Sequence, residues 1–160
     1  MSSADETQAQ SLSTEPLGED WSRFVLDASI ALRWCFGDGS AIDKANAESV
    51  LLAISQGSQV VVPPIWPLEI GNVLLRAERA GHVDRSRIDE FLRLLTEMPI
   101  SIDERASRRA LTDTLGIADM RNLSTYDASY LELATEEGLP LATLDAKLSK
   151  AARDGGVTTL

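Results

Sequence analysis

The sequence predicts a single α/β domain in which helices flank a central parallel sheet of four to five strands. Short apolar runs of strand length alternate with longer segments of helical period, which is typical of parallel strands joined by crossover helices. The chain has 160 residues, and its apolar fraction of 44% is enough for a substantial core. We therefore expect one domain of ordinary size.

The individual elements follow from apolar periodicity and from the residues that interrupt it. Gly57, Gly81 and Gly138 each follow a helical segment, where glycine commonly ends a helix, and Pro63 marks another boundary. The expected strands are residues 23–27, 59–62, 100–102, 140–143 and 157–159. The expected helices are residues 28–36, 42–56, 64–80, 84–97, 103–115, 125–137 and 145–154.

The start of the chain differs in composition from the rest. Five acidic residues and no Lys or Arg lie in residues 1–20, whereas residues 21–160 carry 20 acidic against 15 basic side chains. The first segment also has few large apolar side chains, so burial cannot offset the entropy of ordering it. We predict a disordered acidic extension at residues 1–22 and a folded domain at residues 23–160.

The charge and the apolar pattern exclude several classes of protein. A net charge of -10 is unsuited to a general nucleic-acid coat or to an anionic membrane surface, although a focused binding site remains compatible with it. We expect a cytoplasmic protein without a membrane partner, because neither a secretory signal nor a run of membrane-spanning length is present. Cys35 is the only cysteine, which suits a small core residue, and His82 in a turn suits a surface position better than a catalytic base.

Four acidic residues occupy apolar or tightly turned settings: Asp27, Glu69, Asp127 and Asp145. A buried carboxylate costs several kcal/mol unless it is paired or binds a cation, and no Lys or Arg is adjacent to any of the four. Carboxylate oxygens without nitrogen or sulfur ligands favour Mg²⁺ or Mn²⁺ over zinc. The four residues therefore predict a divalent metal site for phosphate chemistry.

The expected topology brings these acids together. Asp27 and Asp145 each end a predicted strand, and the carboxyl ends of parallel strands lie at one edge of the sheet, where ligands bind. Glu69 and Asp127 lie in the first turns of helices that would begin near the same edge. We expect all four side chains to converge there.

Each acid also has a simpler explanation when it is considered alone. Asp27 and Asp145 suit helix N-caps, and Asp127 follows Ser124 at the spacing of a capping box. Glu69 shares its helical face with Asn72, Arg76 and Arg79, which together suit a solvated polar face. The hydroxyls of Ser29 and Thr143, two residues from neighbouring acids, suit local caps or groups that orient those acids, and we favour the cap for Ser29.

Residues 24–29, 62–72, 126–134 and 141–148 together resemble the four signature blocks of the PIN-domain ribonucleases, and above all the VapC toxins of toxin–antitoxin modules. The order, spacing and residue choice agree across residues 24–157. The resemblance implies a Mg²⁺- or Mn²⁺-dependent endoribonuclease. It places the catalytic, metal-binding acids at Asp27, Glu69, Asp127 and Asp145, with Ser29, Asn72 and Thr143 as supporting polar residues.

The resemblance also implies an RNA substrate, a homodimer and a cognate VapB-like antitoxin whose peptide lies across the site. Three aromatic side chains are candidate anchors for that peptide, although core packing is the commoner role of such residues: Trp34, Phe36 and Trp66. Three arginines are candidate phosphate contacts beside the acids: Arg33, Arg76 and Arg79.

Two other functions compete with a ribonuclease. One is a catalytically silent PIN-like module that only binds a protein. The other is a metal-dependent phosphotransfer domain of the receiver or phosphatase type, but a receiver needs adjacent acids after its first strand and the phosphatases need Asp-x-Asp. Here the first strand is followed by Asp27, Ala28 and Ser29, which fits neither.

Overall fold

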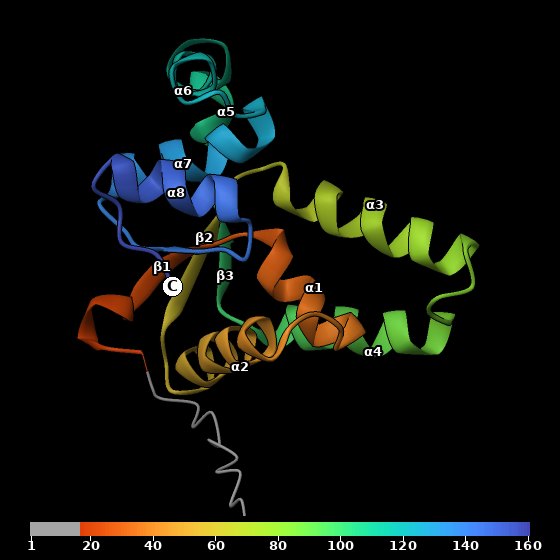
Figure 1. The fold of residues 1–160 in the computed structure, drawn as a ribbon. Helices are drawn as coiled ribbons and strands as arrows, with labels where there is room; N and C mark the ends of the chain where they lie inside the picture. Colours follow the sequence, from red (N-terminus) through yellow and green to blue (C-terminus); the bar gives the residue numbers. More distant parts are fainter. Residues whose placement is uncertain (1–16) are drawn as a thin grey trace, which may run out of the picture.

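The computed structural model describes residues 17–160, which form one α/β domain built on four parallel strands (Figure 1). The strands are β1 (Arg23–Leu26), β2 (Gln59–Val62), β3 (Ile100–Ile102) and β4 (Leu141–Ala142). The longer helices are α1 (Ala28–Phe36), α2 (Ala41–Ser55), α3 (Trp66–Arg79), α4 (Arg85–Glu97), α7 (Thr125–Glu137) and α8 (Ala146–Asp154). The predicted fold class is confirmed.

The strand order is β3-β2-β1-β4, and every pairing is parallel. Strand β1 is therefore central: Val25 pairs with Val61 of β2 on one side and with Leu141 of β4 on the other. The first and last signature segments of the sequence thus become hydrogen-bonded neighbours. The predicted fifth strand at residues 157–159 is wrong, because only an isolated bridge from Thr159 to Leu141 forms there.

The helices cover both faces of this sheet. Figure 1 shows α7 and α8 on one side and α2 and α4 on the other. The sheet's central residues, among them Phe24, Leu26 and Val62, are completely buried between these layers. Cys35 is buried as expected, and burial raises the pKa of its thiol.

The predicted helix at residues 103–115 is the main error in the helical assignment. The structure has a short helix α5 (Ala106–Arg109), a π-helical turn η2 (Ala110–Thr114) and a further helix α6 (Leu115–Arg121). Asp103 does not lie in a helix, because its carboxylate accepts a hydrogen bond from the backbone N–H of Arg105 and so forms the turn before α5. The segment α5-η2-α6 packs on α7 and extends beyond the body of the sheet (Figure 1).

The predicted extension at residues 1–22 falls mainly on residues 1–16, which lie outside the described residues. Its last part is a 3₁₀ turn, η1 (Glu19–Trp21), in which Trp21 is buried with its ring centroid 5.6 Å from that of Phe24. The packed domain therefore begins before Arg23. Within residues 17–160, no helix has both the length and the apolar character required to cross a bilayer.

Candidate functional site

The candidate site begins where β1 and β4 end side by side. Asp27 directly follows β1, and its backbone N–H donates to the carbonyl oxygen of Ala142 in β4 at 2.9 Å. Thr143 and Asp145 follow β4 at the same edge. The prediction that the parallel sheet brings residues 27 and 145 to one edge is therefore confirmed, across a separation of more than one hundred positions.

Asp27 is buried, with only 7% of its surface exposed, and it is held by hydroxyl groups. The hydroxyls of Ser29 and Thr143 donate to its Oδ2 at 2.6 and 2.7 Å. Ser29 Oγ in turn accepts from the backbone N–H of Leu144 at 3.0 Å, and Thr143 Oγ1 accepts from that of Asp145 at 3.0 Å. These two hydroxyls bind the ends of β1 and β4 together and fix the orientation of Asp27.

The structure shows which of the candidate residues cap a helix and which do not. Asp27 occupies the N-cap position of α1, but its side chain makes no capping hydrogen bond, and the Ser29 hydroxyl bonds Asp27 and Leu144 rather than capping a helix. The cap interpretation is therefore wrong for these two residues. Asp145 does cap α8, because its Oδ1 accepts from the backbone N–H of Leu148 at 2.7 Å.

Asp127 and Glu69 are half-buried in the first turns of α7 and α3. Ser124 caps α7 by accepting from the backbone N–H of Asp127 at 3.0 Å, and its hydroxyl donates to Asp127 Oδ2 at 2.8 Å. The carboxylate of Glu69 accepts a short hydrogen bond from the hydroxyl of Tyr130, a completely buried residue of α7. Each acid is thus oriented by a hydroxyl group from α7 or from the turn before it.

The four carboxylates interact electrostatically. Burial raises the pKa of Asp27 most strongly, and the charges of Asp127 and Asp145 raise it further. Burial likewise raises the pKa of Glu69, with contributions from Asp27 and Asp127. The pKa of Tyr130 is also raised by burial and by the adjacent charges of Asp27 and Glu69. Asp27 therefore lies at the centre of a group of mutually repelling charges.

Within the described chain, none of these four acids forms an ion pair with Lys, Arg or His. Among residues 17–160, no group of three or more His, Cys, Asp or Glu side chains is drawn together closely enough to hold a metal ion as it stands. The chemistry of the donors nevertheless fits Mg²⁺ or Mn²⁺, because the donors are carboxylate and hydroxyl oxygens around a buried, unneutralised Asp27.

The basic residues predicted to contact phosphate lie to one side of the acids. Arg33 forms a short ion pair with Asp38, and its Nε is buried without a hydrogen-bond partner among residues 17–160. Arg33 and the exposed Arg76 line one hollow of about 600 Å³, together with the exposed His82. Arg79 is exposed on the last turn of α3. His82 is thus a surface residue, as predicted.

The remaining predicted residues separate into surface and core. Asn72 is exposed and lines a hollow shared with Glu69 and with Tyr126. Trp34 and Phe36 are partly exposed, and each lines a different hollow. Trp66 is only 6% exposed and packs in the core. Of the two roles considered for Trp66, the structure therefore shows the commoner one, core packing, because its ring is not available at the surface for an antitoxin peptide.

Sequence analysis assigned no role to Tyr130, and so missed its contact with Glu69. Tyrosine differs from phenylalanine by a hydroxyl that needs a partner when it is buried, and this requirement was the available signal. The partner itself was hidden, because Glu69 lies 61 positions earlier and only the tertiary fold brings its carboxylate to the hydroxyl of Tyr130.

Comparisons with known proteins agree with this geometry. The family model of the PIN domain matches residues 24–154. Ribonuclease VapC3 of Pyrobaculum aerophilum is 25% identical over 109 residues, covering 68% of this chain and 83% of that protein. The crystal structure of PAE2754 from the same organism superposes with a TM-score of 0.62 at 22% identity, covering 86% of this chain and 88% of that one.

Proposed function

The chain belongs to the PIN-domain family, and from this premise we propose that it is a metal-dependent endoribonuclease that acts as the toxin of a toxin–antitoxin pair. Its relative VapC3 is named a ribonuclease, which supports a nuclease. The observation that carries the proposal is Asp27, a buried carboxylate surrounded by other acids and held by hydroxyls, with no basic partner among the described residues. A carboxylate in this setting is suited to binding a cation from solution, either before the substrate or together with it.

In the proposed reaction, Asp27 and Asp127 would hold Mg²⁺ or Mn²⁺ directly, and Asp145 and Glu69 would act through water or at a second ion. The chemistry supplied there would be polarisation of the phosphodiester and activation of a water for in-line attack on phosphorus. Ser29 and Thr143 keep the carboxylate of Asp27 in place, because their hydroxyls fix its Oδ2. Tyr130 does the same for Glu69.

The basic residues would supply the positive potential that an acidic protein needs to bind RNA. Arg33 and Arg76 line the same hollow, and Arg79 follows Arg76 by one helical turn. We assign these three arginines to phosphate contacts and Asn72 to a polar contact beside Glu69. Contacts to the phosphate groups of a nucleic acid position it on the protein without reading its base sequence.

The proposed partners follow from the VapC-like relative. They are an RNA substrate in the cytoplasm, a second copy of this chain, and a VapB-like antitoxin that covers the acids. Trp34 and Phe36 are the two surface aromatic residues that fit an antitoxin peptide, because their rings remain partly exposed in hollows.

The decisive test is cleavage of total RNA and of single-stranded oligonucleotides by the purified protein with Mg²⁺, Mn²⁺ or EDTA. We expect cleavage only with metal. Asp27→Asn should lower the cleavage rate about a hundredfold or more, since even substitution of a residue that hydrogen-bonds to a metal ligand lowers activity tenfold to a hundredfold. A matched control is Asp84→Asn, which keeps a good N-cap at the start of α4 outside the site.

Unchanged cleavage in Asp27→Asn would contradict the proposed active site. Failure of the wild-type chain to cleave RNA with either metal, while it still captures a small antitoxin, would favour the silent protein-binding module instead. Growth arrest on expression of the wild-type chain, but not of Asp27→Asn, would support the role as a toxin.

A further inference from the structure

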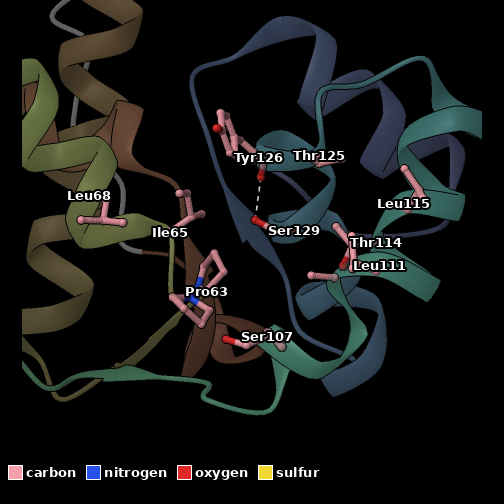
Figure 2. A pocket seen from close by; sticks show the side chains of 13 residues that line it. Pro63, Ile65, Leu68, Ser107, Leu111, Thr114, Leu115, Thr125, Tyr126 and Ser129 are labelled. Carbon is pink, nitrogen blue, oxygen red and sulfur yellow. Dashed lines mark hydrogen bonds between the residues drawn. The ribbon is translucent and has the colours of Figure 1, made fainter.

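An apolar hollow of about 390 Å³ opens beside the carboxylates, and the proposed reaction does not use it. Figure 2 shows Pro63 and Ile65, which follow β2, on one wall and Leu111 and Thr114 of η2 on the other. Tyr126 and Ser129, at the start of α7, lie between these walls. One wall of the hollow is therefore formed by the segment α5-η2-α6, which sequence analysis assigned incorrectly.

The hollow adjoins a more polar one that contains one of the four acids. A second hollow contains Glu69 and Asn72, and it shares Ile65, Leu68 and Tyr126 with the apolar one. Tyr126 directly precedes Asp127, so its ring is anchored one residue from a proposed metal ligand. A nucleotide whose phosphate lies at the carboxylates can therefore place its neighbouring group in the apolar hollow.

The lining selects the kind of group that fits. The thirteen lining residues, all within the described chain, are uncharged, which disfavours phosphate. The ring of Tyr126 is 59% exposed and free to stack, and the side chain of Leu68 is also exposed. The exposed Ser107 offers a hydroxyl for a polar contact, whereas Thr114 is buried and the hydroxyl of Ser129 is already donated to the carbonyl oxygen of Tyr126 at 2.6 Å. A flat, neutral ring with polar edges matches this lining.

We propose that this hollow is a nucleobase subsite, in which Tyr126 stacks on an unpaired base next to the scissile phosphate. The inference rests on the proposed ribonuclease function and deepens it, because it assigns the base next to the scissile phosphate to a particular hollow and to one residue of this chain. Proteins read RNA mainly through unstacked bases that pack on aromatic side chains. Tyr126 is thus a specificity residue, while the carboxylates perform the chemistry.

The first experiment tests base binding without cleavage. Protein with ¹³C-labelled Ile and Leu methyl groups is titrated in EDTA with adenosine, guanosine, cytidine and uridine, and with ribose 5-phosphate as a probe that has no base. We expect at least one nucleoside to shift the methyl signals of Ile65, Leu68 and Leu111, and ribose 5-phosphate to shift none of them. Leu92 on α4, which is exposed and outside the hollow, is the internal control.

Two variants of Tyr126 separate stacking from packing. Tyr126→Phe keeps the ring and should keep the shifts, whereas Tyr126→Ala should lose them. In cleavage assays we expect Tyr126→Ala to raise KM for single-stranded RNA about tenfold with little change in kcat, in line with the loss of one base stack. Tyr126→Phe should remain close to the wild type.

Three results would overturn the subsite: no shift with any nucleoside, equal shifts with ribose 5-phosphate, or RNA cleavage by Tyr126→Ala with unchanged KM and unchanged cleavage positions. A fourth is that a second copy fills the hollow. In that case the methyl signals would move with protein concentration alone, and Leu111→Glu would halve the molecular mass. Because the titration needs neither metal nor cleavage, nucleoside binding without RNA cleavage would refute the proposed nuclease and not the subsite.

Discussion

Helix α7 contributes a carboxylate to each of two acidic clusters, and the clusters are neutralised in different ways. Glu132, in the middle of the helix, is buried and accepts a hydrogen bond from Arg109 Nε at 2.6 Å. Arg109 also donates to Asp103 at 3.1 Å, and Arg105 donates to the same carboxylate at 3.0 Å. At the start of the helix, Asp127 joins Asp27 and Glu69, whose described partners are hydroxyls and not cations.

The pKa values reflect this difference. Burial opposes the ionisation of Asp103, yet hydrogen bonds from Arg105 and Arg109 outweigh it and hold the pKa of Asp103 below its ordinary range. At Asp27 burial is the dominant influence, and two hydroxyl bonds do not prevent the pKa from rising. The first cluster has its basic partners within the folded chain, whereas we propose that the second is neutralised by a cation from solution. Asp103 and Asp27 are both buried, so burial of an acid indicates a candidate metal site only when the partners of that acid are also known.

We expect the largest effect on stability from breaking the paired cluster. Arg109→Leu leaves Glu132 buried without its basic partner, so the free energy of unfolding should fall by about 3–5 kcal/mol in urea denaturation. Asp27→Asn, measured in EDTA, should cost nothing, because it removes a charge that has no cation. Arg79→Leu, an exposed change, is the control and should stay within about 0.5 kcal/mol. Equal losses in Arg109→Leu and Asp27→Asn would break the comparison.

Metal should stabilise only the unpaired cluster. At a concentration one hundred times its Kd, Mg²⁺ or Mn²⁺ should add about 2.7 kcal/mol, which corresponds to a rise of roughly 5–10 °C in Tm for a chain of this size. Differential scanning fluorimetry of Asp27→Asn should show no such rise. Glu132→Gln should melt earlier without metal yet keep the full metal-dependent rise. A Tm of the wild type that does not change on addition of millimolar Mg²⁺ or Mn²⁺ would contradict the proposed site.

A smaller effect is expected where the unpaired cluster depends on a hydroxyl. Tyr130→Phe removes the donor to Glu69 and should lower the free energy of unfolding by about 1 kcal/mol. It should also weaken metal binding about tenfold, as expected for a group that orients a ligand. Isothermal titration with Mn²⁺ measures the second change. Tyr126→Phe is the matched control, and similar affinities in the two variants would exclude an orienting role for Tyr130.

The smallest effect is a slope of stability against pH in the metal-free protein. The folded state raises the pKa values of Asp27 and Glu69, so it keeps protons that the unfolded chain has already released. Their contribution to stability is therefore complete below the ordinary carboxyl pKa near 4 and is lost as pH rises through the raised values. In EDTA, the free energy of unfolding of the wild type should therefore fall relative to that of Asp27→Asn as the pH rises above about 4. A constant difference would show that Asp27 titrates normally.

Local sequence was sufficient for much of the fold and for naming the four acids as candidates. Helices α1 and α7 begin and end where sequence analysis placed them, because the residue before each helix and the glycine that follows it act within a few residues. Asp27 and Asp145 could be placed at one edge, because parallel strands all end on the same side. These features depend on neighbouring residues or on the direction of the chain.

Only the tertiary structure decided how each acid is neutralised. The sequence gives Glu132 and Asp127 the same helix and the same charge, but Arg109 reaches one and not the other. The π-helical turn η2 and helix α6 were likewise not predictable, because their conformation depends on packing against α7. Charge and periodicity are properties of residues, whereas the partner of a buried charge is set by which distant segments the sheet brings within hydrogen-bonding distance.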